Sequence, residues 1–152
     1  MAVQQWKDNP FFDATKEVFQ SMLDMEISPL PENGGTGREE NVRVEIALVG
    51  DLSGTVVYNF PKSTTLNIVK ALSGMDADQL DEFATSMLGE MANIISGNAV
   101  TALSGQNYQC DIKPPQITVG SADSGKYCDS VDLQLRAPVG EMCEHIRLSS
   151  KS

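Results

Sequence analysis

The chain has 152 residues, 41% of them apolar and 21% charged, which is the size and composition of one ordinary globular domain. Its formal net charge of -10 argues against nucleic acid as a partner, because proteins that bind it need clustered Lys and Arg to displace counterions. The same charge argues against an anionic membrane surface, and no apolar run approaches the ~20 residues of a membrane span. Since the first residues carry no basic-then-apolar signal pattern, we expect a cytoplasmic protein.

The first predicted elements are a helix, a loop and a hairpin. Residues 10–26 predict an amphipathic helix, whose apolar side chains recur at three- and four-residue steps: Phe11, Ala14, Val18, Met22 and Met25. Pro, Gly and charged residues fill 28–41 and predict an exposed loop. Two alternating runs, 42–50 and 54–60, then predict a β-hairpin that turns between Gly50 and Gly54.

Two helices and several strands follow. A short helix is predicted to begin near Pro61 and to end at Gly74, and a long one runs from a cap at Asp76 or Asp78 to about Leu103. The apolar residues of the long helix at helical spacing are Leu80, Phe83, Met87, Met91, Ile94 and Ile95. The rest alternates as strands, over 108–120, 126–137 and 141–150, with a turn over Pro138, Val139 and Gly140. This order predicts an α+β fold in which helices cover a mainly antiparallel sheet.

The cysteine and histidine content predicts neither a metal site nor a nucleophilic one. Cys110, Cys128 and Cys143 are odd in number, widely spaced and without a C-x-x-C pair, so we expect free thiols and no zinc site or disulfide framework. His145 is the only histidine, and any Ser-His-Asp or Cys-His device would have to run through it. We therefore do not expect nucleophilic catalysis of that type.

One face of the long helix carries residues that a solvated face does not need. At 100° per residue, Ser86, Glu90, Asn93 and Gly97 fall within an arc of about 60°. Asn and Gly each cost roughly 0.5 to 1 kcal/mol against Ala inside a helix, where Lys or Gln would be solvated equally well. Gly89 and Gly97 also remove side chains beside the carboxylate and the amide. The pattern predicts a face that another surface can approach closely.

The order of these residues resembles a family signature. Ser86, Glu90 and Asn93 follow the pattern S/D-x-x-x-E-x-x-N, with Gly97 four residues on and Pro114-Pro115 about twenty residues beyond. This resembles the CheC/CheX/FliY family of bacterial chemotaxis phosphatases. The single clear motif and the single-domain length are more similar to CheX than to CheC, which has two such helices. The resemblance implies one CheX-like domain over 1–152, with the CheC-like fold.

Members of this family remove the phosphoryl group from the aspartate of phosphorylated CheY, a receiver-domain protein. The resemblance implies that Asn93 orients the attacking water, that Glu90 pairs with the active-site lysine of the receiver, and that Ser86, Gly89 and Gly97 contact the partner. It implies no cofactor and no metal for this chain, since the receiver supplies Mg²⁺. The partner is then a phosphorylated CheY-like receiver domain, in chemotaxis or related two-component signalling.

Three alternatives stay open. A non-catalytic relative would dock a receiver domain or a flagellar-switch protein without hydrolysing it, although intact Glu90 and Asn93 favour hydrolysis. Asp13, Glu17 and Gln20 in the first helix repeat the spacing of the motif and could form a second site. CheX-like proteins are often dimers, and the alternating strands offer unpaired edges through which two copies could join, so a homodimer is open as well.

Overall fold

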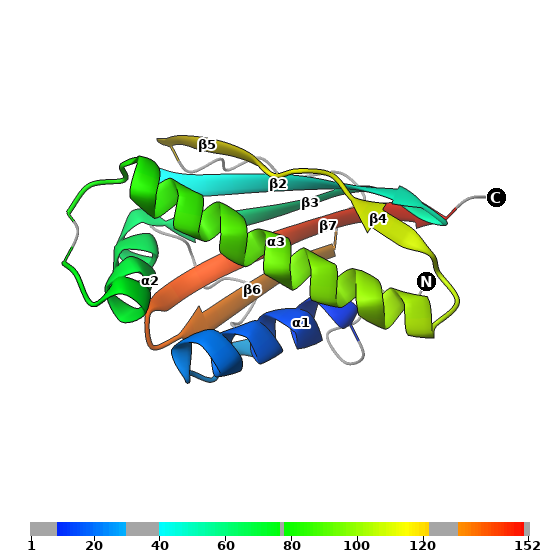
Figure 1. Ribbon diagram of the computed structural model, residues 1–152, viewed down its shortest axis with the longest axis horizontal. Helices are drawn as coiled ribbons and strands as arrows, with labels where there is room; N and C mark the ends of the chain where they lie inside the picture. Colours follow the sequence, from blue (N-terminus) through cyan, green and yellow to red (C-terminus); the bar gives the residue numbers. More distant parts are fainter. Residues whose placement is uncertain (1–8, 30–39, 77, 122–130, 151–152) are drawn as a thin grey trace.

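A seven-stranded antiparallel sheet covered on one face by helices forms the fold (Figure 1). The computed structural model describes residues 9–29, 40–76, 78–121 and 131–150. The helices are α1 (Pro10–Val18), its π-helical continuation η1 (Phe19–Leu23), α2 (Lys62–Ser73) and α3 (Glu82–Gly105). The strands are β1 (Ser28–Pro29), β2 (Glu40–Gly50), β3 (Leu52–Pro61), β4 (Cys110–Ile112), β5 (Gln116–Ser121), β6 (Val131–Ala137) and β7 (Gly140–Ser150). The predicted α+β fold is confirmed.

The sheet is built around two hairpins, β2–β3 and β6–β7, joined through the pairing of β3 with β7 in the order β1-β6-β7-β3-β2-β4. Strands β4 and β5 both pair with β2, with Leu48 opposite Ile112 and Glu45 opposite Gln116. The break between them holds Lys113, Pro114 and Pro115, and proline has no N–H to donate to a neighbouring strand. The prolines therefore interrupt the edge pairing beside β2.

The first helix and the following loop differ from the prediction. The helix ends at Leu23 instead of residue 26, because Asp24 has a left-handed backbone with φ of 55°. The wider π turn of η1 places Phe19 and Leu23 in the core, whereas Met22 is exposed. The loop predicted over 28–41 is shorter, since residues 28–29 form β1 and residues 40–41 begin β2. Its remaining part, 30–39, lies outside the described residues.

Helix α3 begins at a different cap than predicted, and of its predicted apolar set Met91 and Ile95 are buried, Leu80, Met87 and Ile94 pack partly buried against the core, and Phe83 alone is exposed. Its N-cap is Asp81, whose side chain accepts a hydrogen bond from the Ala84 N–H at 2.9 Å, so the prediction of Asp76 or Asp78 is wrong. The buried face consists mainly of small and branched residues: Ala84, Leu88, Met91, Ala92, Ile95, Ala99 and Leu103. Phe83, predicted as part of the apolar set, is 49% exposed. The helix thus packs on the sheet with Phe83 turned toward solvent.

Two buried hydroxyl contacts fasten the long helices to the sheet. On α3, the Ser96 hydroxyl hydrogen-bonds the Tyr58 hydroxyl of β3 at 2.7 Å, and both residues are fully buried. On α1, the Thr15 hydroxyl hydrogen-bonds the Glu144 carboxyl of β7, again with both residues buried. Because Tyr58 and Glu144 are cross-strand neighbours, the two helices are held at adjacent points of the sheet.

Candidate functional site

The candidate site is the outward face of α3, which crosses the sheet diagonally in Figure 1. At 100° per residue the core residues of α3 centre about 180° away from Ser86, Glu90, Asn93 and Gly97, so these four residues share one solvent-facing stripe. Ser86 and Glu90 are exposed, and Asn93 and Gly97 are partly exposed. We call these four residues the α3 stripe. The structure therefore places the predicted residues together, within reach of a second macromolecule.

Glu90 and Asn93 lie one helical turn apart on the α3 stripe. Within the described ranges, no hydrogen bond or ion pair engages either side chain. A carboxylate and an amide held side by side by a regular helix, with their polar atoms open, can bind polar groups of an incoming partner. The carboxylate suits a cation, whereas the amide can accept from and donate to one water molecule.

The two glycines of the predicted site differ in what surrounds them. Nothing lies within 4 Å of where a Cβ would stand on Gly97, so this glycine does leave open space on the stripe. Gly89 is buried, and a Cβ there would lie 2.5 Å from Cδ1 of Ile117 on β5. The expectation that Gly89 makes room for a partner is therefore corrected: its missing side chain accommodates Ile117 of the same chain.

Pro114 and Pro115 border the site on the side of β5. The ring of Pro115 comes to 4.0 Å from the position of a Cβ on Gly89, which places it next to the turn of α3 that carries Glu90. The two prolines line a groove together with Glu45, Ala47, Lys113 and Gln116. Pro115, more than twenty residues beyond α3's motif in the sequence, thus lies against the helix at Gly89.

The Ser96 hydroxyl fixes how α3 is rotated on the sheet. Ser96 follows Asn93 by three residues but lies on the buried flank of the helix, where it is held by Tyr58. Rotating α3 so as to turn the α3 stripe away from solvent would break this buried hydrogen bond and leave two hydroxyls unpaired. Sequence reasoning missed Ser96 and Tyr58, because their contact joins residues 38 positions apart.

Glu144 is a fully buried carboxyl group with a raised pKa. Thr15 has one hydroxyl proton, and its oxygen lies 2.8 Å from the carbonyl of Phe11 as well as against Glu144. If the proton is donated to the Phe11 carbonyl, the hydrogen bond to Glu144 needs a proton on the carboxyl. Burial raises the pKa of Glu144 to about 8, which agrees with a proton on this carboxyl group. Burial and the neighbouring Glu144 also raise the pKa of Tyr58 well above its usual value.

The second motif-like set lies on the surface of α1 and η1. Asp13, Glu17 and Gln20 are exposed and line a groove together with Lys16 and Ser21. The Gln20 amide is not open, because its Nε2 donates to Oδ1 of Asp24 at 3.1 Å. The sequence spacing therefore does not reproduce the open amide of the α3 stripe.

The single histidine does approach a cysteine and a carboxylate, on the sheet. Nδ1 of His145 lies 2.7 Å from Asp132, and its Nε2 lies 3.6 Å from Sγ of Cys143. Burial is the main cause that raises the pKa of the Cys143 thiol to about 11. A buried thiol held in its protonated form is a poor nucleophile. The cluster does not support nucleophilic catalysis, in line with the expectation from the sequence.

Among the residues that the structure describes, no group of three or more His, Cys, Asp or Glu is placed to hold a metal ion. Cys110 and Cys143 are free thiols, while Cys128 falls outside the described residues. No helix in the described ranges is long and apolar enough to span a membrane.

Fold and site together define a single α+β domain that presents a carboxylate and an amide on one exposed face of a long helix. The comparisons with known proteins give this domain a family. Residues 42–143 match the family model described as chemotaxis phosphatase CheX, about two thirds of the chain. The chain belongs to the CheX family.

Individual relatives agree with this assignment. The chain is 29% identical to the CheY-P phosphatase CheX of Thermotoga maritima, with 95% of each protein covered. The crystal structure of chemotaxis protein CheX from Vibrio vulnificus superposes with a TM-score of 0.81 at 22% identity, covering 93% of this chain and 97% of that one. A CheX–CheY–BeF3–Mg²⁺ complex from Borrelia burgdorferi gives a TM-score of 0.70 at 25% identity, covering 93% and 96%.

Proposed function

We propose that this protein is a phosphatase that hydrolyses the aspartyl phosphate of a CheY-like response regulator. The observation that carries the proposal is the pair formed by Glu90 and Asn93, open and one turn apart on a helix whose rotation Ser96 fixes. Family membership supports it, as does the similarity to the Thermotoga CheY-P phosphatase. The Borrelia structure, in which CheX is bound to CheY, supports a receiver domain as the partner.

The reaction needs positioning more than it needs reactive groups. A water oxygen attacks the phosphorus in line with the bond to the aspartate oxygen, that P–O bond breaks, and the aspartate leaves as a carboxylate. The water gives up its protons to the released phosphate and to solvent. In this proposal Asn93 holds the attacking water through its amide, which can accept one hydrogen bond and donate another without ionising.

Glu90 has a separate role, because its negative charge would repel a phosphoryl group that it faced directly. Paired with the active-site lysine of the receiver, the carboxylate orients α3 on its partner and keeps Asn93 in register. The Mg²⁺ that neutralises the phosphoryl charge comes with the receiver and not with this chain. Ser86 and Gly97 complete the contact surface, and the protein acts in the cytoplasm, where it meets the receiver.

The experiment follows the lifetime of the phosphoaspartate in a panel of phosphorylated CheY-like receivers. The wild-type protein shortens the lifetime for its cognate receiver, and Asn93→Ala loses ~10²-fold or more of this acceleration with an unchanged fold. Asn98→Ala is the matched control, because it removes the same amide from α3 outside the stripe and should keep the rate. A receiver that binds with no change of lifetime would instead support the non-catalytic docking module.

A further inference from the structure

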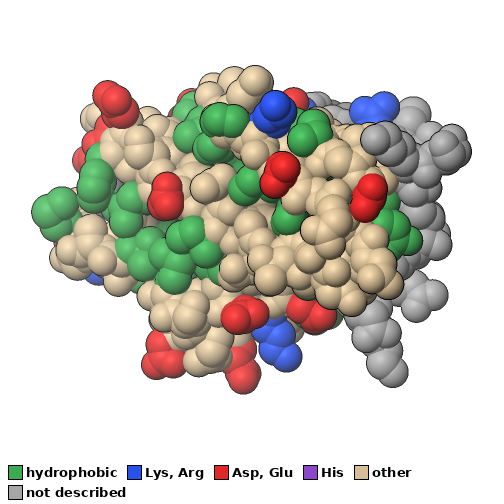
Figure 2. Space-filling view, turned by 45° about the vertical axis from the view of Figure 1, so that its right-hand side comes forward, with side chains coloured by type: hydrophobic (Ala, Val, Ile, Leu, Met, Phe, Trp, Pro, Cys, Tyr) green, Lys and Arg blue, Asp and Glu red, His purple; other side chains and the backbone are tan. Residues whose placement is uncertain are grey.

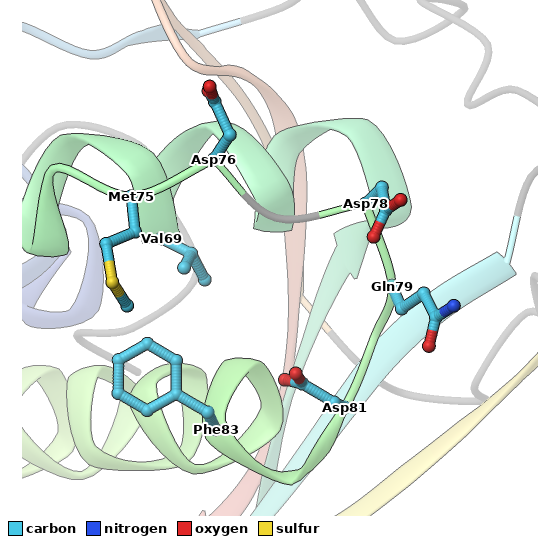
Figure 3. A pocket seen from close by; sticks show the side chains of 7 residues that line it. All are labelled: Val69, Met75, Asp76, Asp78, Gln79, Asp81 and Phe83. Atoms are coloured by element: carbon cyan, nitrogen blue, oxygen red, sulfur yellow. The ribbon is translucent and has the colours of Figure 1, made fainter.

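Two of the most solvent-exposed large hydrophobic side chains lie together beside the α3 stripe. Met75 is 58% exposed and Phe83 is 49% exposed, the two highest values among the large hydrophobic residues that the structure describes. Both line a cavity of about 190 Å³ together with Val69. In Figure 3 the end of the Met75 side chain points toward the ring of Phe83, and Val69 lies beside Met75. We call this cavity, between the end of α2 and the start of α3, the α2–α3 hollow. In Figure 2 hydrophobic side chains gather at the left of the molecule, the end where Figure 1 shows α2 and the start of α3.

The rim of the α2–α3 hollow is acidic. Asp76, Asp78 and Asp81 line it beside the apolar residues. Lys70 lies 3.2 Å from Asp76 and balances that one charge. Asp81 uses Oδ1 to cap α3, which leaves its second oxygen for another donor. The remaining charge is negative, so the hollow repels a phosphoryl group and favours a cation.

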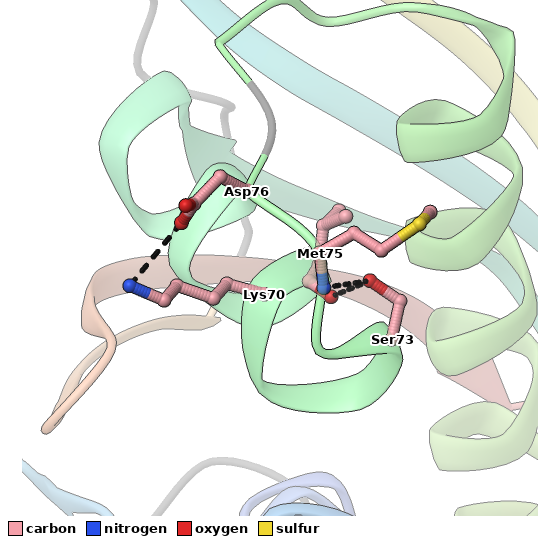
Figure 4. A network of polar contacts seen from close by, with 5 residues as sticks. Lys70, Ser73, Met75 and Asp76 are labelled. Carbon is pink, nitrogen blue, oxygen red and sulfur yellow. Dashed lines mark hydrogen bonds and ion pairs between the residues drawn. The ribbon is translucent and has the colours of Figure 1, made fainter.

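The segment that carries Met75 is held in place before any partner arrives. The Ser73 hydroxyl donates to the Val69 carbonyl at 2.6 Å and accepts from the Met75 N–H at 3.2 Å. Figure 4 shows Ser73 beside Met75 in this turn. Gly74 closes α2 in the left-handed conformation, with φ of 75°, and its N–H donates to the Lys70 carbonyl. These hydrogen bonds constrain the turn in the free protein, which lowers the entropy cost of binding there.

The helix geometry makes the hollow part of the same surface as the α3 stripe. Phe83 precedes Glu90 by seven residues, so at 100° per residue the two lie within about 20° around α3 and about 10 Å apart along it. A stable interface covers about 800 Å² on each partner, a patch of about 16 Å radius. A receiver seated on Glu90 and Asn93 with an interface of that size cannot avoid Phe83.

We propose that the α2–α3 hollow is the second contact point for the receiver domain, an inference that rests on the proposed function. It takes one apolar side chain of the receiver between Met75 and Phe83, and a neighbouring Lys or Arg of the receiver against Asp78 and Asp81. The cavity is smaller than the ~300 to 1,000 Å³ of small-molecule pockets, which fits a single inserted side chain. The hollow thus supplies affinity and choice of receiver, whereas the α3 stripe supplies the reaction.

The test separates binding from chemistry. Phe83→Ser and Met75→Ser are compared with wild type in hydrolysis of the phosphorylated cognate receiver, and in binding of the Mg²⁺- and beryllofluoride-loaded receiver. We expect each variant to raise KM and Kd about tenfold, because anchors buried in an interface cost more than about 1 kcal/mol when truncated. We expect kcat within about twofold of wild type, since Phe83 lies ~15 Å along α3 from Asn93, which orients the water. Met22→Ser, which truncates an exposed methionine on η1, is the matched control and should change neither quantity.

A charge variant tests the acidic rim separately. Asp78→Asn should weaken binding by a few-fold at low salt and should reduce the loss of affinity as salt is raised. Thermal unfolding of each variant, matched to wild type, excludes a folding defect.

The possible failures are distinct. If wild type hydrolyses the phosphorylated receiver and both serine variants keep the wild-type KM and Kd, the proposal that the receiver contacts the α2–α3 hollow is wrong. The proposed function is then unaffected. If the receiver binds in a manner that depends on Phe83 but its phosphoaspartate is not hydrolysed, the proposed function is wrong. The α2–α3 hollow is then supported as a contact point for the receiver. A shift of the free protein from dimer to monomer in Phe83→Ser, with receiver affinity unchanged, would assign the hollow to a second copy of this chain and overturn the proposal.

Discussion

Helices α1 and α3 are built alike and differ in what their outward faces leave open. Each has a side-chain N-cap, Asn9 on α1 and Asp81 on α3, and each is fastened to the sheet by one buried hydroxyl. Each also carries an acidic residue followed three positions later by an amide: Glu17 on α1 with Gln20 on its continuation η1, and Glu90 with Asn93 on α3.

The difference arises one turn beyond the amide. Four residues after Gln20 stands Asp24, whose carboxylate accepts the Gln20 amide at 3.1 Å. Four residues after Asn93 stands Gly97, which has no side chain and nothing within 4 Å of a Cβ position. Gln20 also lies in the wider π turn of η1, whereas Asn93 lies in regular helix. The comparison shows that the same spacing leaves an amide open only where the next turn has no side chain to bind it.

The largest effect that we predict is the pH dependence of stability that arises from Glu144, the β7 partner of Thr15 on α1. Since the folded pKa of Glu144 is about 8 and its ordinary value is 4.5, the folded state keeps a proton that the unfolded state releases over this range. Its contribution to stability is complete below pH 4.5, falls by about 1.4 kcal/mol per pH unit, and is lost above pH 8. The free energy of unfolding, measured with denaturant, should therefore fall by up to about 4 kcal/mol more in wild type than in Glu144→Gln between pH 5 and pH 8.

The hydrogen bond between Ser96 of α3 and Tyr58 of β3 provides the control for this pH dependence. The pKa of Tyr58 is raised and stays above the range tested, so Tyr58→Phe should shift stability equally at every pH from 5 to 8. Equal slopes of stability against pH in wild type and Glu144→Gln would show that Glu144 is already ionised in the folded protein.

The next prediction compares the two acidic residues. Glu90→Ala should lower kcat/KM for the phosphorylated receiver by ~10²-fold, or about 2.7 kcal/mol, because a charge-assisted pair with the partner is lost. Glu17→Ala removes the equivalent carboxylate from α1 and should leave kcat/KM within about twofold. The readout is the phosphoaspartate lifetime at several receiver concentrations. A comparable loss in Glu17→Ala would make α1 a second active face.

Patterns local in sequence predicted much of this structure. Alternation of apolar and polar residues along β2 and β3 correctly predicted the hairpin, and Gly74 correctly predicted the end of α2. The angle of 100° per residue correctly placed the α3 stripe on one face of the helix. The stripe could be found because its four residues lie on one helix, so their relative positions depend only on helical geometry.

Features that depend on distant partners were not predictable in the same way. Thr15 meets Glu144 across 129 residues, and β1 exists only because β6 lies beside it. The burial of Gly89 depends on Ile117 of β5, which follows β4 and the break that holds two prolines. The exposure of Phe83 was predictable, because its position around the helix lies within about 20° of Glu90. The prediction failed because an apolar side chain was expected in the core.

A smaller effect is expected from the hydroxyl pair that fastens α3. Tyr58→Phe removes the partner of the Ser96 hydroxyl and leaves that group buried and unpaired, which should cost about 2 kcal/mol of unfolding free energy. Ser96→Ala in the same chain should recover part of the loss, because both polar groups are then gone. Tyr108→Phe, at a partly exposed tyrosine beyond α3, is the control and should lie within about 0.5 kcal/mol of wild type. Additive losses in the double variant would contradict a direct contact.

The smallest effects concern Gly89 and Gly97 of α3, whereas α1 contains no glycine. Gly97→Ala adds a methyl group in open space and improves helix propensity, so it should raise the unfolding free energy by up to about 1 kcal/mol. If Gly97 admits the receiver, the same variant should raise KM while stability rises. Gly89→Ala should instead lower stability by about 1 kcal/mol, since its Cβ would overlap Cδ1 of Ile117.

Ile117→Val distinguishes these two roles, because it removes the Cδ1 atom that a Cβ on Gly89 would meet. Combined with Gly89→Ala it should restore stability, and KM should stay near the wild-type value throughout, since Gly89 faces the chain itself. When Ile117→Val is combined with Gly97→Ala, the raised KM should not change, because nothing in the chain lies within 4 Å of a Cβ on Gly97 and there is no steric overlap to remove. A rise of KM in Gly89→Ala that persists with Ile117→Val would mean that the receiver reaches beneath β5, and the boundary drawn here between the buried and the open glycine would fail.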